Sequence, residues 1–190
     1  FALFIFANVS SVTNLQPDIP LRSLYLRNRF FYTFGAVAFL FTLAYPFSWL
    51  FVPALTAFLI GVVLVGVDVA LLYAGNTGLA AQRSLNPVFS LSDDNPVQIR
   101  IANNGSQRWH LEVIDELPIQ FQRRDFTSEL WLAPGEKQTL RYDLRPLSRG
   151  VYAFGNVLAF VSSRIGLVER RIAFEQATDV AVYPSIIQLK

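Results

Sequence analysis

The chain has 190 residues, of which 53% are hydrophobic and 16% are charged, and its formal net charge is +2. This length allows a membrane segment and one domain of ordinary size. The small net charge gives no reason to expect a nucleic-acid partner. Cysteine is absent, which excludes disulfides and thiolate chemistry. Methionine is also absent and the sequence begins with Phe1, so we expect it to be part of a longer protein.

Residues 1–20 have no assignment from their pattern. The apolar run at residues 1–7 is too short to cross a bilayer, which takes roughly 20 helical residues. It is compatible with the end of a helix, with a strand, or with a loosely placed segment. It lacks the basic region of a signal peptide.

A basic juxtamembrane segment is expected at residues 21–29. Arg22, Arg27 and Arg29 alternate there with leucine and tyrosine. Such a mixture suits the lipid headgroup region, where apolar faces enter the bilayer and cations meet anionic lipid.

Residues 30–75 predict a two-helix transmembrane hairpin. One apolar run extends from Phe30 to Tyr45, and a second from Leu50 to Tyr73, with Pro46 between them. Helices satisfy all their backbone hydrogen bonds internally, as lipid requires. The first run is short for a span unless it extends back through Tyr25. A buried helical hairpin in a soluble protein is the alternative.

Aromatic side chains mark the expected interfaces of this hairpin. Tyr45 and Trp49 lie at the turn, and Tyr73 lies near the other interface. Small residues at four-residue spacing in the second helix predict a face that packs on the first helix: Ala57, Gly61, Gly66, Ala70 and Ala74.

Asp68 is the only acidic or basic residue between Phe30 and Gln82. A charged residue within a membrane run is a functional candidate. We expect it to pair with Arg29 or Arg83 near the headgroups and to fix the depth of the hairpin. Ion transport is the alternative, but a single acid without polar companions makes a poor conduction path.

The distribution of arginines predicts the orientation of the hairpin. Arg22, Arg27 and Arg29 precede it and Arg83 follows it, whereas the turn carries no charge. The positive-inside rule therefore places both ends of the hairpin, and the whole β module, on the cytoplasmic side of a bacterial inner membrane.

Residues 83–190 predict an all-β module of the antiparallel immunoglobulin-like β-sandwich type. Apolar residues alternate with polar ones from Val97 to Ile101, from Trp109 to Val113 and from Leu140 to Leu144. Further strands are expected at 129–133, 151–154, 157–162, 167–174 and 180–183. Turn residues separate them, and seven or more short strands in about a hundred residues are typical of such a sandwich.

No pattern in the chain predicts catalysis, a metal site or a cofactor. The single histidine, His110, is expected on the exposed face of its strand rather than as a catalytic base. Asp93 and Asp94 precede a turn, and Asp115 lies at a turn or strand end, without the regular oxygen spacing of a calcium loop. No phosphate-binding loop or small-molecule site is evident. The arginines of the β module form either a docking surface or an ordinary solvated face.

Several segments resemble bacterial membrane proteins of domain-of-unknown-function family fifty-eight. The most specific is Arg145 to Gly155, in which Arg145, Arg149, Gly150, Tyr152, Phe154 and Gly155 form a signature and possible docking site. It reads as a tight turn between two strands, with Tyr152 and Phe154 supporting the core. The other matching segments lie at 24–32, 81–85, 92–97, 162–168 and 182–184.

The resemblance implies two membrane helices, a β-rich region and then a domain similar to von Willebrand factor type A. It also implies a partner, a MoxR-type AAA+ ATPase, in chaperone-like complex assembly. The type A-like domain is expected after residue 190, so its metal-ion site is not expected within this sequence. The chain is thus expected to be a non-enzymatic inner-membrane anchor and scaffold, in contact with the lipid bilayer and other membrane subunits. The alternatives are a periplasm-facing cell-envelope binding domain and a structural subunit of a larger membrane complex.

Overall fold

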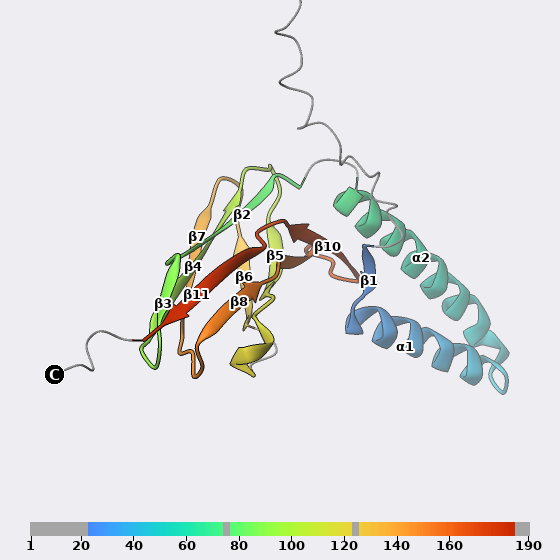
Figure 1. The fold of residues 1–190 in the computed structure, drawn as a ribbon. Helices are drawn as coiled ribbons and strands as arrows, with labels where there is room; N and C mark the ends of the chain where they lie inside the picture. Colours follow the sequence, from blue (N-terminus) through green and yellow to red (C-terminus); the bar gives the residue numbers. More distant parts are fainter. Residues whose placement is uncertain (1–22, 74–76, 123–125, 185–190) are drawn as a thin grey trace, which may run out of the picture.

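The computed structural model describes residues 23–73, 77–122 and 126–184. The interpretations of residues 1–20, Arg22 and Ala74 lie outside the described residues. A pair of helices projects from one end of a β-sandwich, and a short strand lies between the helices and the sandwich (Figure 1).

The two helices are α1, Asn28–Ala44, and α2, Phe51–Tyr73. A turn containing Pro46 and a short 3-10 helix, η2 at Ser48–Leu50, join them. Proline cannot supply the backbone N–H that would continue α1. With 17 residues, α1 is about 25 Å long. The helix does not extend back through Tyr25, which was the condition for a full span, because Leu24–Leu26 form a strand, β1.

The strands form three sheets. The largest has the order β1 (Leu24–Leu26), β10 (Val168–Phe174), β9 (Val157–Ser162), β5 (Trp109–Asp115), β6 (Phe126–Leu132). A second has the order β2 (Leu79–Leu85), β4 (Asn95–Asn103), β7 (Lys137–Leu144). The third has the order β3 (Val88–Ser90), β11 (Thr178–Tyr183), β8 (Gly150–Phe154), and a 3-10 turn, η3 (Ile119–Phe121), follows β5.

The predicted β-sandwich is confirmed, with two differences. The pair β3 and β11 is parallel, whereas the other paired strands in the described chain are antiparallel. The first strand after the helices begins at Leu79 rather than at Arg83. Its periodic signal is weak because Ala81 and Arg83 occupy the two central inward positions, between Leu79 and Leu85.

Two apolar cores fill the space between the sheets. Val97, Ile99 and Ile101 of β4 are at most 2% exposed, as their alternation predicts. The first core joins the five-stranded sheet to the β2–β4–β7 sheet and includes Leu72 from α2. The second core contains Phe89, Tyr152 and Phe154. Because α2 contributes a fully buried leucine, the helices and the sandwich share one core at their junction.

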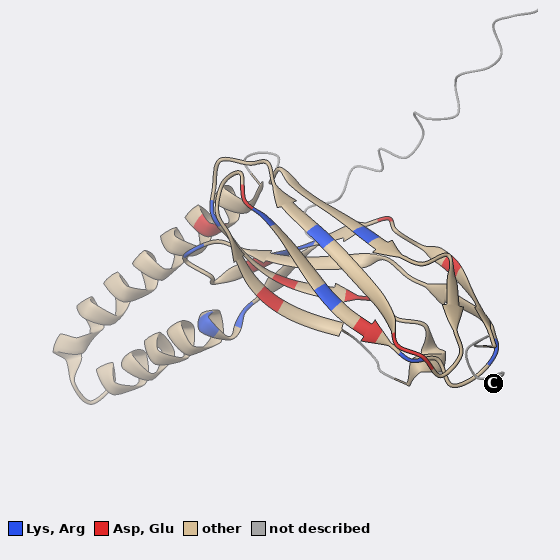
Figure 2. Ribbon diagram, turned by 90° about the vertical axis from the view of Figure 1, so that its left-hand side faces the viewer, with Lys and Arg blue, Asp and Glu red and all other residues tan. Residues whose placement is uncertain are grey.

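Most of the helical surface is apolar and uncovered. Figure 2 shows the two helices nearly free of charged residues, whereas charged residues are spread over the sandwich. One segment in the described chain is long and apolar enough to cross a membrane, Ser48–Tyr73, with mean hydropathy 2.6 and only 6% of its window buried.

Candidate functional site

Asp68 lies at the center of the junction between α2 and the sandwich. It is fully buried, and its carboxylate accepts hydrogen bonds from the backbone N–H groups of Leu167 at 2.8 Å and Val168 at 2.9 Å. The hydroxyl of Ser163 donates a further hydrogen bond to it. The expected pairing with Arg29 or Arg83 is wrong. The carboxylate instead accepts hydrogen bonds from backbone N–H groups where the loop between β9 and β10 ends, and a charged acceptor makes these hydrogen bonds strong.

That loop, residues 163–167, also receives the start of α1. The backbone N–H of Arg27 donates to the carbonyl of Leu167 at 3.1 Å, and the guanidinium of Arg29 donates to the carbonyl of Ile165 at 3.4 Å. Gly166 has a positive φ of 69°, and a Cβ there would meet the Arg29 guanidinium at 3.4 Å. Glycine permits this left-handed turn close to both helices.

The strand β1 and the last turn of α2 add a second set of contacts. Strand β1 pairs antiparallel with β10, with Leu24 opposite Arg170 and Leu26 opposite Val168. The Arg170 guanidinium donates to the carbonyl of Leu72 at 3.2 Å and lies 4.7 Å from the center of the Tyr73 ring. The juxtamembrane segment therefore forms part of the sheet. Tyr73, predicted at a lipid interface, packs on the sandwich instead.

Arg27 belongs to a cluster of polar side chains on the outer face of the five-stranded sheet. Its guanidinium donates to the hydroxyl of Ser162 at 2.8 Å and lies 3.6 Å from Glu169. His110 is 9% exposed, stacks on Trp131 with ring centers 4.6 Å apart, and has Nδ1 3.4 Å from Arg27. The prediction of an exposed His110 is wrong, because Arg27, the residue before α1, and Trp131 of the neighbouring strand β6 cover this face.

Burial and the nearby Arg27 charge lower the pKa of His110 below its model-compound value of 6.5. Both causes act against the charged imidazolium. Burial raises the pKa of Glu169, an effect that the Arg27 charge opposes. The cluster fixes the position of the first residues before α1.

Arg83 lies inside the sandwich and not at a membrane surface. Its guanidinium donates to Asp115 at 2.6 Å and to the carbonyl of Gly155 at 3.1 Å, and it sits 4.9 Å from the center of the Phe154 ring. The expectation that Arg83 anchors the hairpin is thus wrong. Asp115 also accepts a hydrogen bond from Tyr142, and burial raises the pKa of both groups.

The small residues of α2 divide into two groups. A Cβ on Gly61 would meet the Phe34 ring of α1 at 3.4 Å, and Ala57 is partly buried. Gly66 has nothing within 4 Å of such a Cβ, and both it and Ala70 are exposed. The predicted packing face is therefore confirmed only near the turn. The helices diverge from that turn toward the sandwich (Figure 1), which leaves Gly66 and Ala70 uncovered.

The segment Arg145–Gly155 forms the expected turn between β7 and β8. Tyr152 and Phe154 are buried in the second core, and the Tyr152 hydroxyl donates to the carbonyl of Ser148 at 2.9 Å. Arg149 and Gly150 are exposed, and Arg145 Nε donates to the carbonyl of Ser92 at 2.6 Å. Gly155 has no room for a side chain, since a Cβ would lie 2.5 Å from a Glu116 carboxylate oxygen.

The remaining candidates have simple placements. Tyr45 and Trp49 are 95% and 72% exposed at the helical turn. Asp93 lies in a bend before β4, and the described residues contain no group of three metal-ligating side chains. The arrangement that the structure builds most fully is therefore a mechanical junction, which holds two apolar helices in a fixed position on the sandwich.

No protein-family model and no curated protein sequence matches the chain. Among solved structures, the CARDB domain of a Pyrococcus furiosus protein is 18% identical, with 55% of this chain and 87% of that chain covered and a TM-score of 0.40. A PapD-like domain of human CEP192 is 10% identical, with 57% and 87% covered and a TM-score of 0.41. These are similar β-sandwich domains. The assignment of the sandwich rests on the strand pairing described above.

Proposed function

We propose that this chain is an anchor and scaffold of the bacterial inner membrane, in which a helical hairpin enters the bilayer and holds a cytoplasmic β-sandwich at a fixed angle. The observation that carries the proposal is the contrast within α2. Its outer surface exposes large apolar side chains, with Ile60 60% and Val63 63% exposed, while Asp68 and Leu72 near its end are fully buried. Apolar side chains exposed along a whole helix are unfavourable in water, and the hydrocarbon core of a bilayer is the environment that suits such an uncharged surface.

The hairpin is proposed to cross with its turn at the far interface. Tyr45 and Trp49 at the turn are the amphipathic aromatics that favour such a position. α1 is about 25 Å long, a few Å short of a hydrocarbon core of roughly 30 Å, so Arg29 at its start would reach the headgroups through its long side chain and local thinning of the bilayer. Because Arg83 is buried inside the sandwich, the arginines that support the cytoplasmic orientation are Arg22, Arg27 and Arg29.

Lysine substitutions on the helix and on the sandwich test membrane insertion. I60K/V63K places two lysines on the exposed face of α2, and V151K places one on β8, where Val151 is 61% exposed. Each lysine at a helix center costs about 3 kcal/mol on insertion. We expect the wild type and V151K to stay in the membrane pellet after alkaline carbonate washing, and I60K/V63K to be released or degraded. Retention of I60K/V63K in the pellet would contradict the proposal.

Orientation is tested with a single introduced cysteine, since the chain has none of its own. Ser106 is exposed on the loop between β4 and β5. A membrane-impermeant maleimide is expected to label S106C in inverted vesicles but not in intact spheroplasts. Labelling in spheroplasts would instead favour the alternative of a periplasm-facing cell-envelope domain.

The scaffold role extends to a partner through the resemblance described above. The turn with Arg149 lies beside the end of β11, since Val182 pairs with Gly150. The type A-like domain that the resemblance implies would thus lie near Arg145 and Arg149, at the end of the sandwich away from the helices (Figure 1). We expect copurification of a MoxR-type ATPase with the full-length protein to decrease in R145Q/R149Q and to persist in the charge-matched R100Q/R171Q. Equal copurification would remove this turn as the contact.

A further inference from the structure

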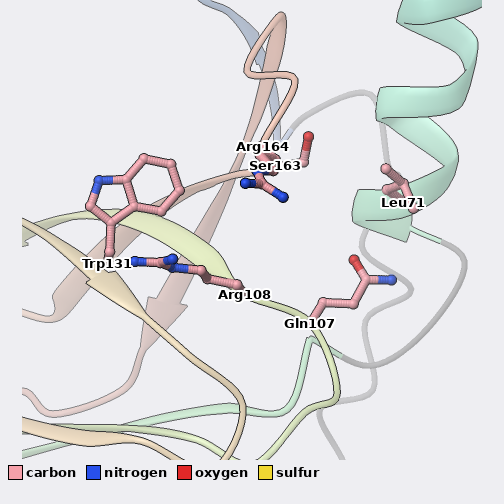
Figure 3. A pocket seen from close by; sticks show the side chains of 6 residues that line it. All are labelled: Leu71, Gln107, Arg108, Trp131, Ser163 and Arg164. Carbon is pink, nitrogen blue, oxygen red and sulfur yellow. The ribbon is translucent and has the colours of Figure 1, made fainter.

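A cavity of about 530 Å³ opens where the last turns of α2 meet the sandwich. Its lining comes from four parts of the chain: α2, the residues just before β5, strand β6, and the loop after β9. In Figure 3 the Arg108 and Arg164 guanidinium groups both lie beside the Trp131 ring, and Leu71 and Gln107 lie on the other side. The cavity therefore combines two cations, an aromatic ring and an apolar helix face.

The two arginines are available to a ligand. Arg108 and Arg164 are exposed, and within the described residues neither forms an ion pair. Arg108 lies 5.4 Å from the center of the Trp131 ring. Glu136, whose pKa Arg108 helps to lower, already accepts hydrogen bonds from the Ala133 N–H and the Gln138 amide. Glu136 thus interacts with Arg108 only at a distance, and no carboxylate in the described chain forms an ion pair with either arginine.

The lining specifies the chemistry of the ligand. Guanidinium groups are planar hydrogen-bond donors that match the oxygens of phosphates and carboxylates, and two of them offer enough donors for several oxygens of a phosphate. Trp131 is 45% exposed and Leu71 is 37% exposed, so the rim of the same cavity is apolar. A ligand with a phosphate attached to an apolar body would use both parts. Tryptophan, with an apolar ring and a polar N–H, is suited to this boundary.

The position of the cavity along α2 points to the source of this ligand. α2 has 23 residues and is about 35 Å long, so Leu71 near its end would lie at headgroup depth if the turn reaches the far interface. We propose that this cavity binds the phosphate of an anionic phospholipid, with Arg108 and Arg164 on the phosphate and with Leu71 and Trp131 on the start of the acyl chains. This inference rests on the proposed membrane insertion of the helices.

Native mass spectrometry of the full chain released from nanodiscs tests the proposal. The nanodiscs contain phosphatidylglycerol and phosphatidylcholine in equal amounts. For the wild type we expect one retained lipid, with phosphatidylglycerol preferred by about tenfold, because two arginines near the surface each favour anionic lipid. R108Q/R164Q is expected to lose this preference. R149Q/R171Q, which removes the same charge from exposed positions elsewhere, is expected to keep it.

An unchanged preference in R108Q/R164Q would overturn the proposal. R108Q alone covers the case in which R164Q alters the loop at residues 163–167, since Arg108 lies outside that loop and its loss should still lower the preference several-fold. A soluble phosphate is distinguished by adding glycerol 3-phosphate to the chain in detergent: protection against thermal unfolding at micromolar concentration, without a retained lipid, would overturn the lipid assignment.

Failure of membrane insertion gives a different result. A chain that does not insert would float with neither phosphatidylcholine vesicles nor vesicles that also contain phosphatidylglycerol. Failure of the lipid site alone leaves flotation with both vesicles intact and removes only the selectivity measured on the retained lipid.

Discussion

The carboxylate of Asp68, on an otherwise uncharged helix, accepts a hydrogen bond from the backbone N–H of Leu167 at 2.8 Å, 99 residues further along the chain. This contact explains why a charged residue occurs in an apolar run. It satisfies loop backbone groups that would otherwise be buried without partners.

Removing this carboxylate is expected to loosen the helices from the sandwich. D68A leaves the N–H groups of Leu167 and Val168 without an acceptor and should cost about 3 kcal/mol in unfolding free energy. D68N retains one acceptor oxygen and should cost less. The measurements are thermal unfolding in detergent and hydrogen exchange of residues 163–168. D94A, at an exposed position, is the control and should change stability by less than about 0.5 kcal/mol. Exchange rates in D68A that match the wild type would contradict the assigned role.

The Arg83–Asp115 pair predicts a pH-dependent defect. R83M leaves Asp115 buried without its cation and should cost about 3 kcal/mol at pH 8. Burial already raises the pKa of Asp115 above 3.8, so the folded chain holds this proton more tightly than the unfolded chain does. The stability that this group contributes therefore falls as pH rises from 3.8 through the raised pKa of the folded chain. Without Arg83 the pKa rises further, and protonation at pH 5 removes the unpaired charge.

The defect of R83M should therefore be smaller at pH 5 than at pH 8. Denaturant unfolding of the detergent-solubilised chain at both values measures this, with R171M as a control for the loss of an exposed arginine. A defect that is independent of pH would show that Asp115 does not titrate in this range.

His110 is the only histidine, so a single proton NMR resonance reports its titration. We expect a pKa below 6.5, because burial and the Arg27 charge both disfavour the imidazolium. The unfolded chain therefore binds this proton more readily, and stability from this group is lost as pH falls through 6.5 toward the lowered value. R27Q should raise the pKa, and R171Q should leave it unchanged. A pKa that does not respond to R27Q would place Arg27 away from the ring.

Two glycines separate backbone strain from steric overlap. Gly78 and Gly135 both have left-handed φ values, 65° and 74°. A Cβ on Gly135 would meet nothing within 4 Å, so G135A should cost about 1 kcal/mol. A Cβ on Gly78 would lie 2.4 Å from the backbone nitrogen of Gly105, so G78A should cost clearly more. Equal changes in the unfolding midpoint would indicate that the backbone at Gly78 moves away from Gly105 without cost.

The sequence predicted the parts of the fold that depend on local pattern. The alternation around Ile99 identifies β4 because one face of that strand is buried. Strand β1 was missed because three residues between arginines carry no periodic signal, and its pairing with β10 is set by contacts far along the chain.

The candidate site was predicted less completely for the same reason. Asp68 was recognised as unusual, but the partners of its carboxylate are backbone groups, which leave no trace in side-chain composition. His110 was placed on a polar face by alternation, and only the tertiary position of Arg27 and Trp131 covers that face. The sequence places Arg83 among the charges that orient the hairpin, because its partner Asp115 is 32 residues away and gives no local signal of the pairing.

The pairing of β1 with β10 also determines the order in which the protein can assemble. Leu26 precedes both helices in the chain, and its partner Val168 lies near the end of the sandwich. During synthesis the helices emerge long before this partner exists. The edge of the sheet nearest the helices can therefore close only at a late stage, when β10 is available. Until that time the hairpin lacks the β1–β10 hydrogen bonds that help to set its angle on the sandwich.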